Sequence, residues 1–94
     1  MSTWATTSIL GEVFKERILQ DKKWGEQNHS PFVWLGILGE EYGEACRGVV
    51  DANLDSYREE LIHTAAVCVS AIECMDRNTV GVKLSKSPID KGES

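Results

Sequence analysis

Two short acidic motifs combine residue types and spacing that can do chemistry. Glu41 and Glu44 form an E-x-x-E motif, and Glu60 and His63 form an E-x-x-H motif further along the chain. Residues three apart on a helix share a face, so each motif presents its two side chains together. If the two helices are antiparallel, the charges converge, and this arrangement is costly without a cation. Oxygen-rich sites suit Mg²⁺ or Mn²⁺, so these four residues are predicted to hold such an ion.

The same residues also fit roles without a metal. Exposed glutamates are common on helix surfaces, so the motifs are compatible with a solvated charged face. His63 can ligate a metal, orient a water beside it, or only face solvent or pack against a neighbour. Glu40 and Glu59 precede predicted ligands and could orient a water, although helix geometry turns adjacent residues about 100° apart.

Three helices are predicted to position these motifs, over residues 8–23, 31–52 and 56–77. Thr6, Thr7 and Ser8 offer caps to the first helix, and Ser30 before Pro31 is typical of a helix start. Ser56 to Glu59 has the form of a capping box for the third helix. Apolar residues at helical spacing are expected to face inward. They are Ile9, Val13, Phe14, Ile18 and Leu19 on the first helix, and Leu61, Ala65, Cys68, Ile72 and Met75 on the third.

The fold class expected from these elements is all-α, an antiparallel helical bundle over residues 1–78 with a mobile or extended tail over 79–94. A chain of 94 residues with 41% apolar content forms only a small core. We therefore expect a homo-oligomer, a dimer or a tetramer, to complete the bundle. Trp34 is expected in the core or a subunit contact, and Trp4 at an interface or in a frayed end. Glycines 36, 39 and 43 indicate either close contact with another helix or room for a ligand.

Charge and composition exclude several classes of function. The segment 40–60 carries seven acids against two bases and so accounts for the whole formal charge of −5. Such a surface repels phosphates, so direct nucleic-acid binding is not expected. No apolar run is long enough for a membrane span and no leader is recognisable, so a cytoplasmic protein is expected. The three cysteines lack C-x-x-C spacing and are expected to be reduced.

The loop between the first two predicted helices is a candidate substrate site. Lys23, with Lys22 beside it, supplies positive charge for a triphosphate, and Trp24 offers a face on which a base can stack. Gln27, Asn28 and His29 offer hydrogen bonds to the edge of a base. Alternatively, Trp24 anchors the loop in the core while the two amides bond to turn backbone.

The order and spacing of these motifs resemble a known family. E-x-x-E followed by E-x-x-H, together with "ERILQDKKWGEQNHSP", "WLGILGEEYGEACRGVV" and "YREELIHTAAV", is similar to small single-domain MazG-like proteins of phages and bacteria. These are nucleoside triphosphate pyrophosphohydrolases, and the similarity extends over about residues 12–75. The family pattern has an acid where this chain has His63, a departure that favours Mn²⁺ over Mg²⁺ if the imidazole ligates.

The resemblance implies a metal-dependent enzyme that hydrolyses a (d)NTP to a (d)NMP and pyrophosphate, for nucleotide-pool adjustment or house-cleaning. It places Glu41, Glu44 and Glu60 at catalytic metal-ligand positions and implies an oligomer in the cytoplasm, that of the host if a phage encodes it. The alternatives are a catalytically weak helical module that senses nucleotide or binds a partner, and a purely structural helical oligomer.

Overall fold

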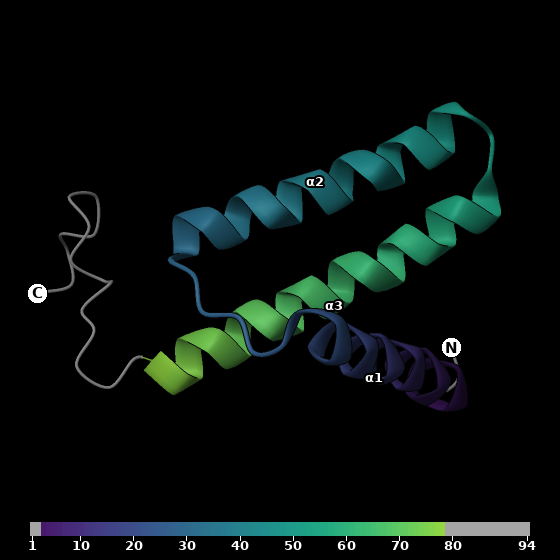
Figure 1. Ribbon diagram of the computed structural model, residues 1–94. Helices are drawn as coiled ribbons and strands as arrows, with labels where there is room; N and C mark the ends of the chain where they lie inside the picture. Colours follow the sequence, from purple (N-terminus) through teal and green to yellow (C-terminus); the bar gives the residue numbers. More distant parts are fainter. Residues whose placement is uncertain (1–2, 79–94) are drawn as a thin grey trace, which may run out of the picture.

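Three helices make up the computed structural model, which describes residues 3–78 (Figure 1). They are α1 (Thr3–Trp24), α2 (Pro31–Val50) and α3 (Leu54–Asn78). The predicted all-α class is confirmed, and the described residues contain no strand. The tail predicted over 79–94 lies outside the described residues.

α3 is the central element of the fold. α2 folds back antiparallel along one side of α3, and α1 packs against another side (Figure 1). No Cα atom of α1 lies within 8 Å of a Cα atom of α2. Consequently, any site that combines side chains of α1 and α2 must also involve α3.

The helix starts agree only in part with the sequence prediction. Ser30 caps α2 as expected, because its Oγ accepts a hydrogen bond from the Val33 amide at 3.3 Å and proline follows it. The third helix begins earlier than predicted, since Asn53 Oδ1 accepts from the Ser56 amide at 3.1 Å and so replaces the predicted Ser56 cap. α1 also begins earlier, at Thr3, because extending an existing helix adds a hydrogen bond for each residue fixed.

The turn between α2 and α3 depends on one close backbone approach. A Cβ atom at Gly48 would lie 2.9 Å from the Tyr57 amide nitrogen, so only glycine fits there. Ala52 then reverses the chain with φ of 55°, and Asp51 ends α2. By contrast, a Cβ at glycines 36, 39 or 43 would meet nothing within 4 Å, so the expected helix contact is not made within the described chain.

The core is small, and α3 buries a different stripe from the predicted one. Its buried residues are Ala66, Val67, Ser70 and Cys74. Trp34 of α2 joins this core at 6% exposure, in agreement with one of its two predicted places. The predicted inward stripe is largely exposed, with Ile72 at 54% and Met75 at 48%. The prediction was wrong because α3 packs between two helices, so α1 and α2 together decide which arc is covered.

Much apolar surface of residues 3–78 is therefore exposed. On α1 only Val13 is buried, whereas the other four residues predicted to face inward are exposed. Trp4 is 83% exposed within α1, and Phe32, at the start of α2, is also 83% exposed. Cys46, Cys68 and Cys74 are free thiols, as expected. Among residues 3–78, no helix is both long and apolar enough to cross a bilayer.

Candidate metal centre

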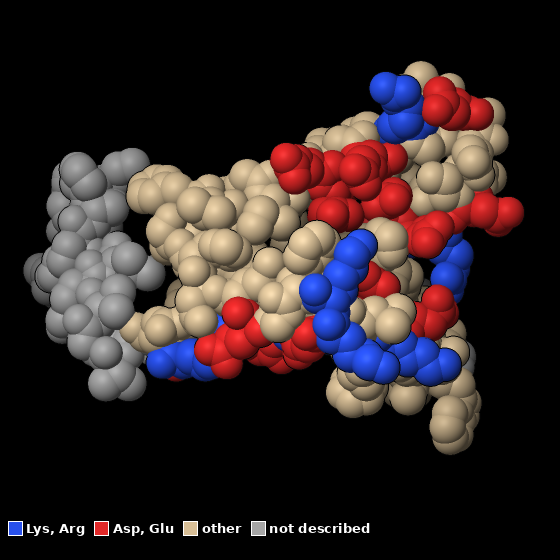
Figure 2. All heavy atoms as spheres, viewed as in Figure 1, with Lys and Arg blue, Asp and Glu red and all other residues tan. Residues whose placement is uncertain are grey.

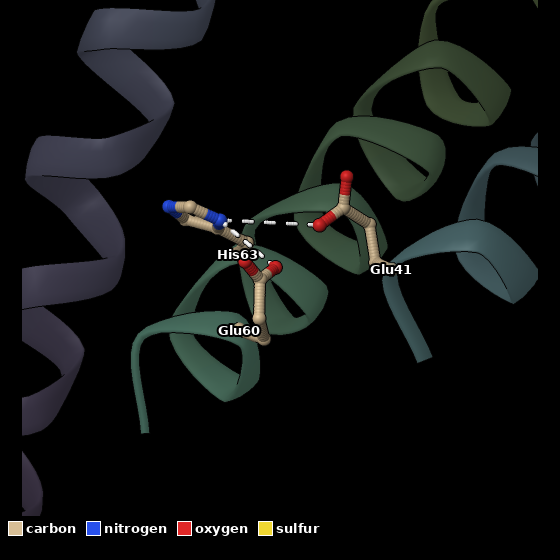
Figure 3. Close-up of side chains that lie close together, drawn as sticks. All are labelled: Glu41, Glu60 and His63. Atoms are coloured by element: carbon tan, nitrogen blue, oxygen red, sulfur yellow. Dashed lines mark hydrogen bonds and ion pairs between the residues drawn. The ribbon is translucent and has the colours of Figure 1, made fainter. Parts of the chain in front are cut away.

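Three of the four predicted metal ligands converge between α2 and α3. One ligand atom from each of Glu41, Glu60 and His63 lies within 4.8 Å of the others (Figure 3). His63 Nδ1 lies 3.2 Å from Glu60 Oε1 and 3.9 Å from Glu41 Oε1. The three side chains are 16–27% exposed, so they are partly withdrawn from water yet reachable from it.

Local structure explains why these side chains meet. Glu60 and His63 are one turn apart on α3, and the Thr64 hydroxyl donates to the Glu60 carbonyl at 2.7 Å on that same turn. The close contact of Gly48 with Tyr57 holds the start of α3 against the end of α2. Glu41 is two turns before Gly48 on α2, so the antiparallel pair brings its carboxylate beside Glu60 and His63.

The charge balance of the group fits a bound cation. Glu41 Oε1 is buried and accepts no hydrogen bond, which is a costly state for a carboxylate oxygen. Burial raises the pKa of Glu41, and the nearby Glu60 and Glu44 carboxylates raise it further. Two carboxylates and an imidazole are a suitable donor set for Mn²⁺ or Mg²⁺, and an ion between them would satisfy Glu41 Oε1.

The Glu41 and Glu60 carboxylates also change the pKa of His63. Partial burial lowers the pKa of the imidazole, but the Glu16, Glu60 and Glu41 carboxylates outweigh this, so the pKa is raised overall. A proton on His63 and a metal ion at the group are therefore alternative ways to neutralise the same carboxylates. Metal binding to this group should release protons.

Glu44, the fourth predicted ligand, lies outside this group. It is exposed on α2, and its charge reaches the group only through its effect on the pKa of Glu41. Glu40 is exposed too, and Glu59 Oε2 lies 3.9 Å from His63 Nε2 on a side chain that is 68% exposed. The direct ligation predicted for Glu44 is not formed among the described residues, and it stays a prediction.

Sequence reasoning missed one carboxylate beside the group. Glu16 of α1 has its Oε1 atom 3.7 Å from His63 Nε2, on the side of the ring away from Glu60. Glu16 is the first residue of the quoted stretch ERILQDKKWGEQNHSP, but it received no ligand role because its distance along the chain from His63 hides the contact. The residue is 21% exposed, which is similar to the predicted ligands.

A cleft beside Glu41 contains some of the predicted substrate residues. It has a volume of about 270 Å³, and Trp24 and Gln27 line it together with Gln20 and Glu41. Lys23 is close by, with its Nζ 5.0 Å from the centre of the Trp24 ring. An aromatic ring and amide groups thus share a cleft with Glu41, and a cation lies beside the aromatic ring.

Asn28 and His29 are placed elsewhere, contrary to their predicted role in this cleft. The Asn28 side-chain oxygen accepts hydrogen bonds from Arg77 at 3.0 Å and from Asn78 at 2.8 Å. The His29 ring packs edge-on against Trp34, with 5.0 Å between the ring centres. Both residues fix the loop to the end of α3, because a six-residue connection between α1 and α2 must cross that end.

Comparisons with protein-family models, with curated proteins and with solved structures give no match for this chain. The resemblance to MazG-like proteins therefore remains a prediction from the quoted sequence motifs. The features of the structure that bear on function are the group formed by Glu41, Glu60 and His63 and the cleft beside Glu41.

Proposed function

We propose that this protein is a metal-dependent hydrolase that converts a (d)NTP to a (d)NMP and pyrophosphate. The observation that carries the proposal is the buried, unpartnered Oε1 atom of Glu41 beside Glu60 and His63. Carboxylates placed this close together are costly unless a proton or a cation neutralises them, and a bound cation would also satisfy Glu41 Oε1. The adjoining cleft offers contacts that suit a nucleotide rather than a metal alone.

Each side chain has a distinct role in this proposal. Glu41, Glu60 and His63 hold Mg²⁺ or Mn²⁺, and Glu44 joins them after a change of side-chain torsion. The ion supplies positive charge for phosphate oxygens and acidifies a water. Trp24 stacks on the base, Gln27 bonds to its edge, and Lys23 attracts the phosphates. In this proposal the side chains of the cleft bind and orient the nucleotide. The carboxylates bind the ion, which neutralises their charge.

The proposed enzyme is a homo-oligomer, either a dimer or a tetramer. Large apolar side chains on all three helices are exposed, including Phe14 at 66%, Leu35 at 64% and Ile72 at 54%. A chain that buries so little gains stability when copies of it cover one another. The exposed glycine stripe of α2 would allow a helix of another copy to approach closely. We place the enzyme in the cytoplasm.

Pyrophosphate release tests the function directly. Purified protein with Mn²⁺ is incubated with each common (d)NTP, and Glu41→Gln and Glu60→Gln are compared with the wild type. Both variants should lose turnover without a fall in melting temperature, because glutamine keeps the shape while removing charge. Glu12→Gln is the matched control, since Glu12 pairs with Arg58 and is not one of the three grouped residues.

Two other results would contradict hydrolysis. Stabilisation by nucleotide and Mn²⁺ together, without pyrophosphate release, would favour a nucleotide-sensing module, in which His63 in place of an acid accounts for the lost activity. No response to nucleotide or metal would favour a structural helical oligomer.

A further inference from the structure

The imidazole of His63 lies between two sets of carboxylates on opposite edges of the ring. Nδ1 faces Glu60 and Glu41 (Figure 3), whereas the distance of 3.7 Å places Nε2 beside Glu16 of α1. Figure 3 shows the ring extending from α3 toward the α1 ribbon, with its other edge toward Glu41 and Glu60. The two nitrogens therefore have separate environments, one at the candidate metal centre and one outside it.

We infer that Glu16 is a positioning residue for His63, which presents Nδ1 to the metal while Glu16 accepts a hydrogen bond from Nε2–H. This inference rests on the proposed function, because it requires a metal at the group. A neutral imidazole that gives the Nδ1 lone pair to a metal must carry its proton on Nε2. A carboxylate that accepts this proton in a hydrogen bond fixes the ring orientation and makes the ligand nitrogen more basic.

Without metal, the tautomer with its proton on Nδ1 has the closer hydrogen-bond acceptor. Nδ1 lies 3.2 Å from Glu60 Oε1, within hydrogen-bonding reach, whereas the 3.7 Å from Nε2 to Glu16 Oε1 is too long for a hydrogen bond. Ligation through Nδ1 would leave the imidazole proton on Nε2, where Glu16 would accept it. The Glu16 side chain would have to approach from 3.7 Å to the usual hydrogen-bond distance of about 2.9 Å.

The Glu16 carboxylate also belongs to a series of polar contacts on α1. Its Oε2 atom accepts from Gln20 Nε2 at 3.5 Å, which leaves Oε1 for His63. Arg17 Nη1 donates to the Gln20 side-chain oxygen at 3.2 Å, and Arg17 also pairs with Glu73 of α3. These contacts tie Glu16 to α3, so it is better ordered for this role than Glu59, which is 68% exposed at 3.9 Å from the same nitrogen.

Glu16→Gln tests this role through metal affinity. Free Mn²⁺ is measured by electron paramagnetic resonance during titration of the wild type, Glu16→Gln and Glu12→Gln. Loss of a carboxylate behind a ligating histidine should weaken Mn²⁺ binding about 10-fold or more. Glu12→Gln removes the same charge one turn earlier on α1, where Glu12 pairs with Arg58 and is 41% exposed, so its Mn²⁺ affinity should change much less than that of Glu16→Gln.

The tautomer of His63 gives a second readout that a merely structural role would not change. Because the chain has only two histidines, ¹⁵N spectra of the imidazoles can be assigned readily. With Zn²⁺ as a diamagnetic probe, wild-type His63 should carry its proton on Nε2, and Glu16→Gln should shift that Nε2 resonance. Equal Mn²⁺ affinity in Glu16→Gln and wild type, or a proton that stays on Nδ1, would overturn the inference while leaving the metal site intact. A wild type that binds no Mn²⁺ would overturn both.

Discussion

The two halves of the α2–α3 pair share one backbone arrangement but differ in chemistry. The half near the connecting turn, which we call the carboxylate half, contains Glu41, Glu60 and His63. The other half, which we call the apolar half, surrounds a cavity of about 570 Å³ lined by residues such as Trp34, Leu35, Ile72 and Met75. Figure 2 shows acidic side chains gathered over the carboxylate half, whereas the start of α2 is bare of charge.

Each half lacks a different kind of partner. In the carboxylate half a buried oxygen accepts no hydrogen bond, and a cation would satisfy it. In the apolar half large side chains such as Leu35 and Ile72 remain more than half exposed, and only other apolar surface would cover them. We therefore propose metal binding for the first half and self-association for the second, and we expect that each can be perturbed without the other.

The largest effect is expected from a charge placed in the apolar half. Ile72→Glu should dissociate the oligomer at concentrations where wild type is assembled, because burying an unpaired charge costs about 3–5 kcal/mol. Sedimentation velocity measures the change. Val50→Glu is the control, since Val50 is 80% exposed beside the turn in the carboxylate half. If the two variants behave alike, the division into halves is wrong.

Mn²⁺ should stabilise the protein through the carboxylate half alone. At a concentration of 100 times its Kd, an ion that binds only the folded state adds about 2.7 kcal/mol to the free energy of unfolding. Thermal denaturation with and without Mn²⁺ should show this gain in wild type and in Ile72→Glu, but not in Glu41→Gln. A gain that persists in Glu41→Gln would place the ion elsewhere.

The turn that joins the two helices should tolerate no side chain at Gly48. Gly48→Ala should lower the free energy of unfolding by about 1–3 kcal/mol, because the new Cβ would press on the Tyr57 backbone. Gly43→Ala should instead raise it by up to about 1 kcal/mol in the monomeric Ile72→Glu background, since helix propensity improves in open space. Urea denaturation compares the two, and equal effects would contradict the close helix approach that brings Glu41 to Glu60.

A smaller effect is expected from pH in the metal-free protein. The pKa values of Glu41 and His63 are both raised on folding, from 4.5 and 6.5 respectively. Each contribution to stability is fully present below the unfolded pKa and is lost as pH rises through the folded pKa. The melting temperature should therefore fall as pH rises above 4.5 and fall further as it rises above 6.5, and saturating Mn²⁺ should reverse this slope because it binds the deprotonated groups.

Glu12 provides a control for this pH dependence. Arg58 lowers the pKa of Glu12, so the contribution of Glu12 to stability is present above its unfolded pKa of 4.5 and is lost only as pH falls below it. Glu12→Gln should keep the wild-type pH dependence, whereas Glu41→Gln should flatten it. A metal-free melting temperature that rises with pH would show that folding does not raise the pKa values of Glu41 and His63.

Local signals in the sequence predicted the helices and one cap well. Ser30 and Pro31 predicted the start of α2 because capping depends on neighbouring residues only, and the three-residue spacing placed Glu60 beside His63. The buried stripe of α3 could not be predicted this way, since two packing partners select Ala66, Val67 and Cys74 over the larger Ile72 and Met75.

The part of the site that comes from α1 was also beyond local reasoning. Glu16 reaches His63 only because α1 packs on α3, and a periodic pattern does not specify which helices touch. For Asn28, the sequence suggested contact with a nucleotide, whereas the structure shows contacts with α3. Its amide suited a nucleotide base, but the end of α3 supplies Arg77 and Asn78 as partners that no motif announces.

Anomalous diffraction from a crystal grown with Mn²⁺ would decide whether the carboxylate half holds an ion. We predict a manganese peak between α2 and α3, within about 2.0–2.3 Å of oxygens from Glu41 and Glu60. Carboxylates of Glu41 and Glu60 that point into bulk water, with no manganese peak between them, would contradict the metal site and the hydrolase proposed from it.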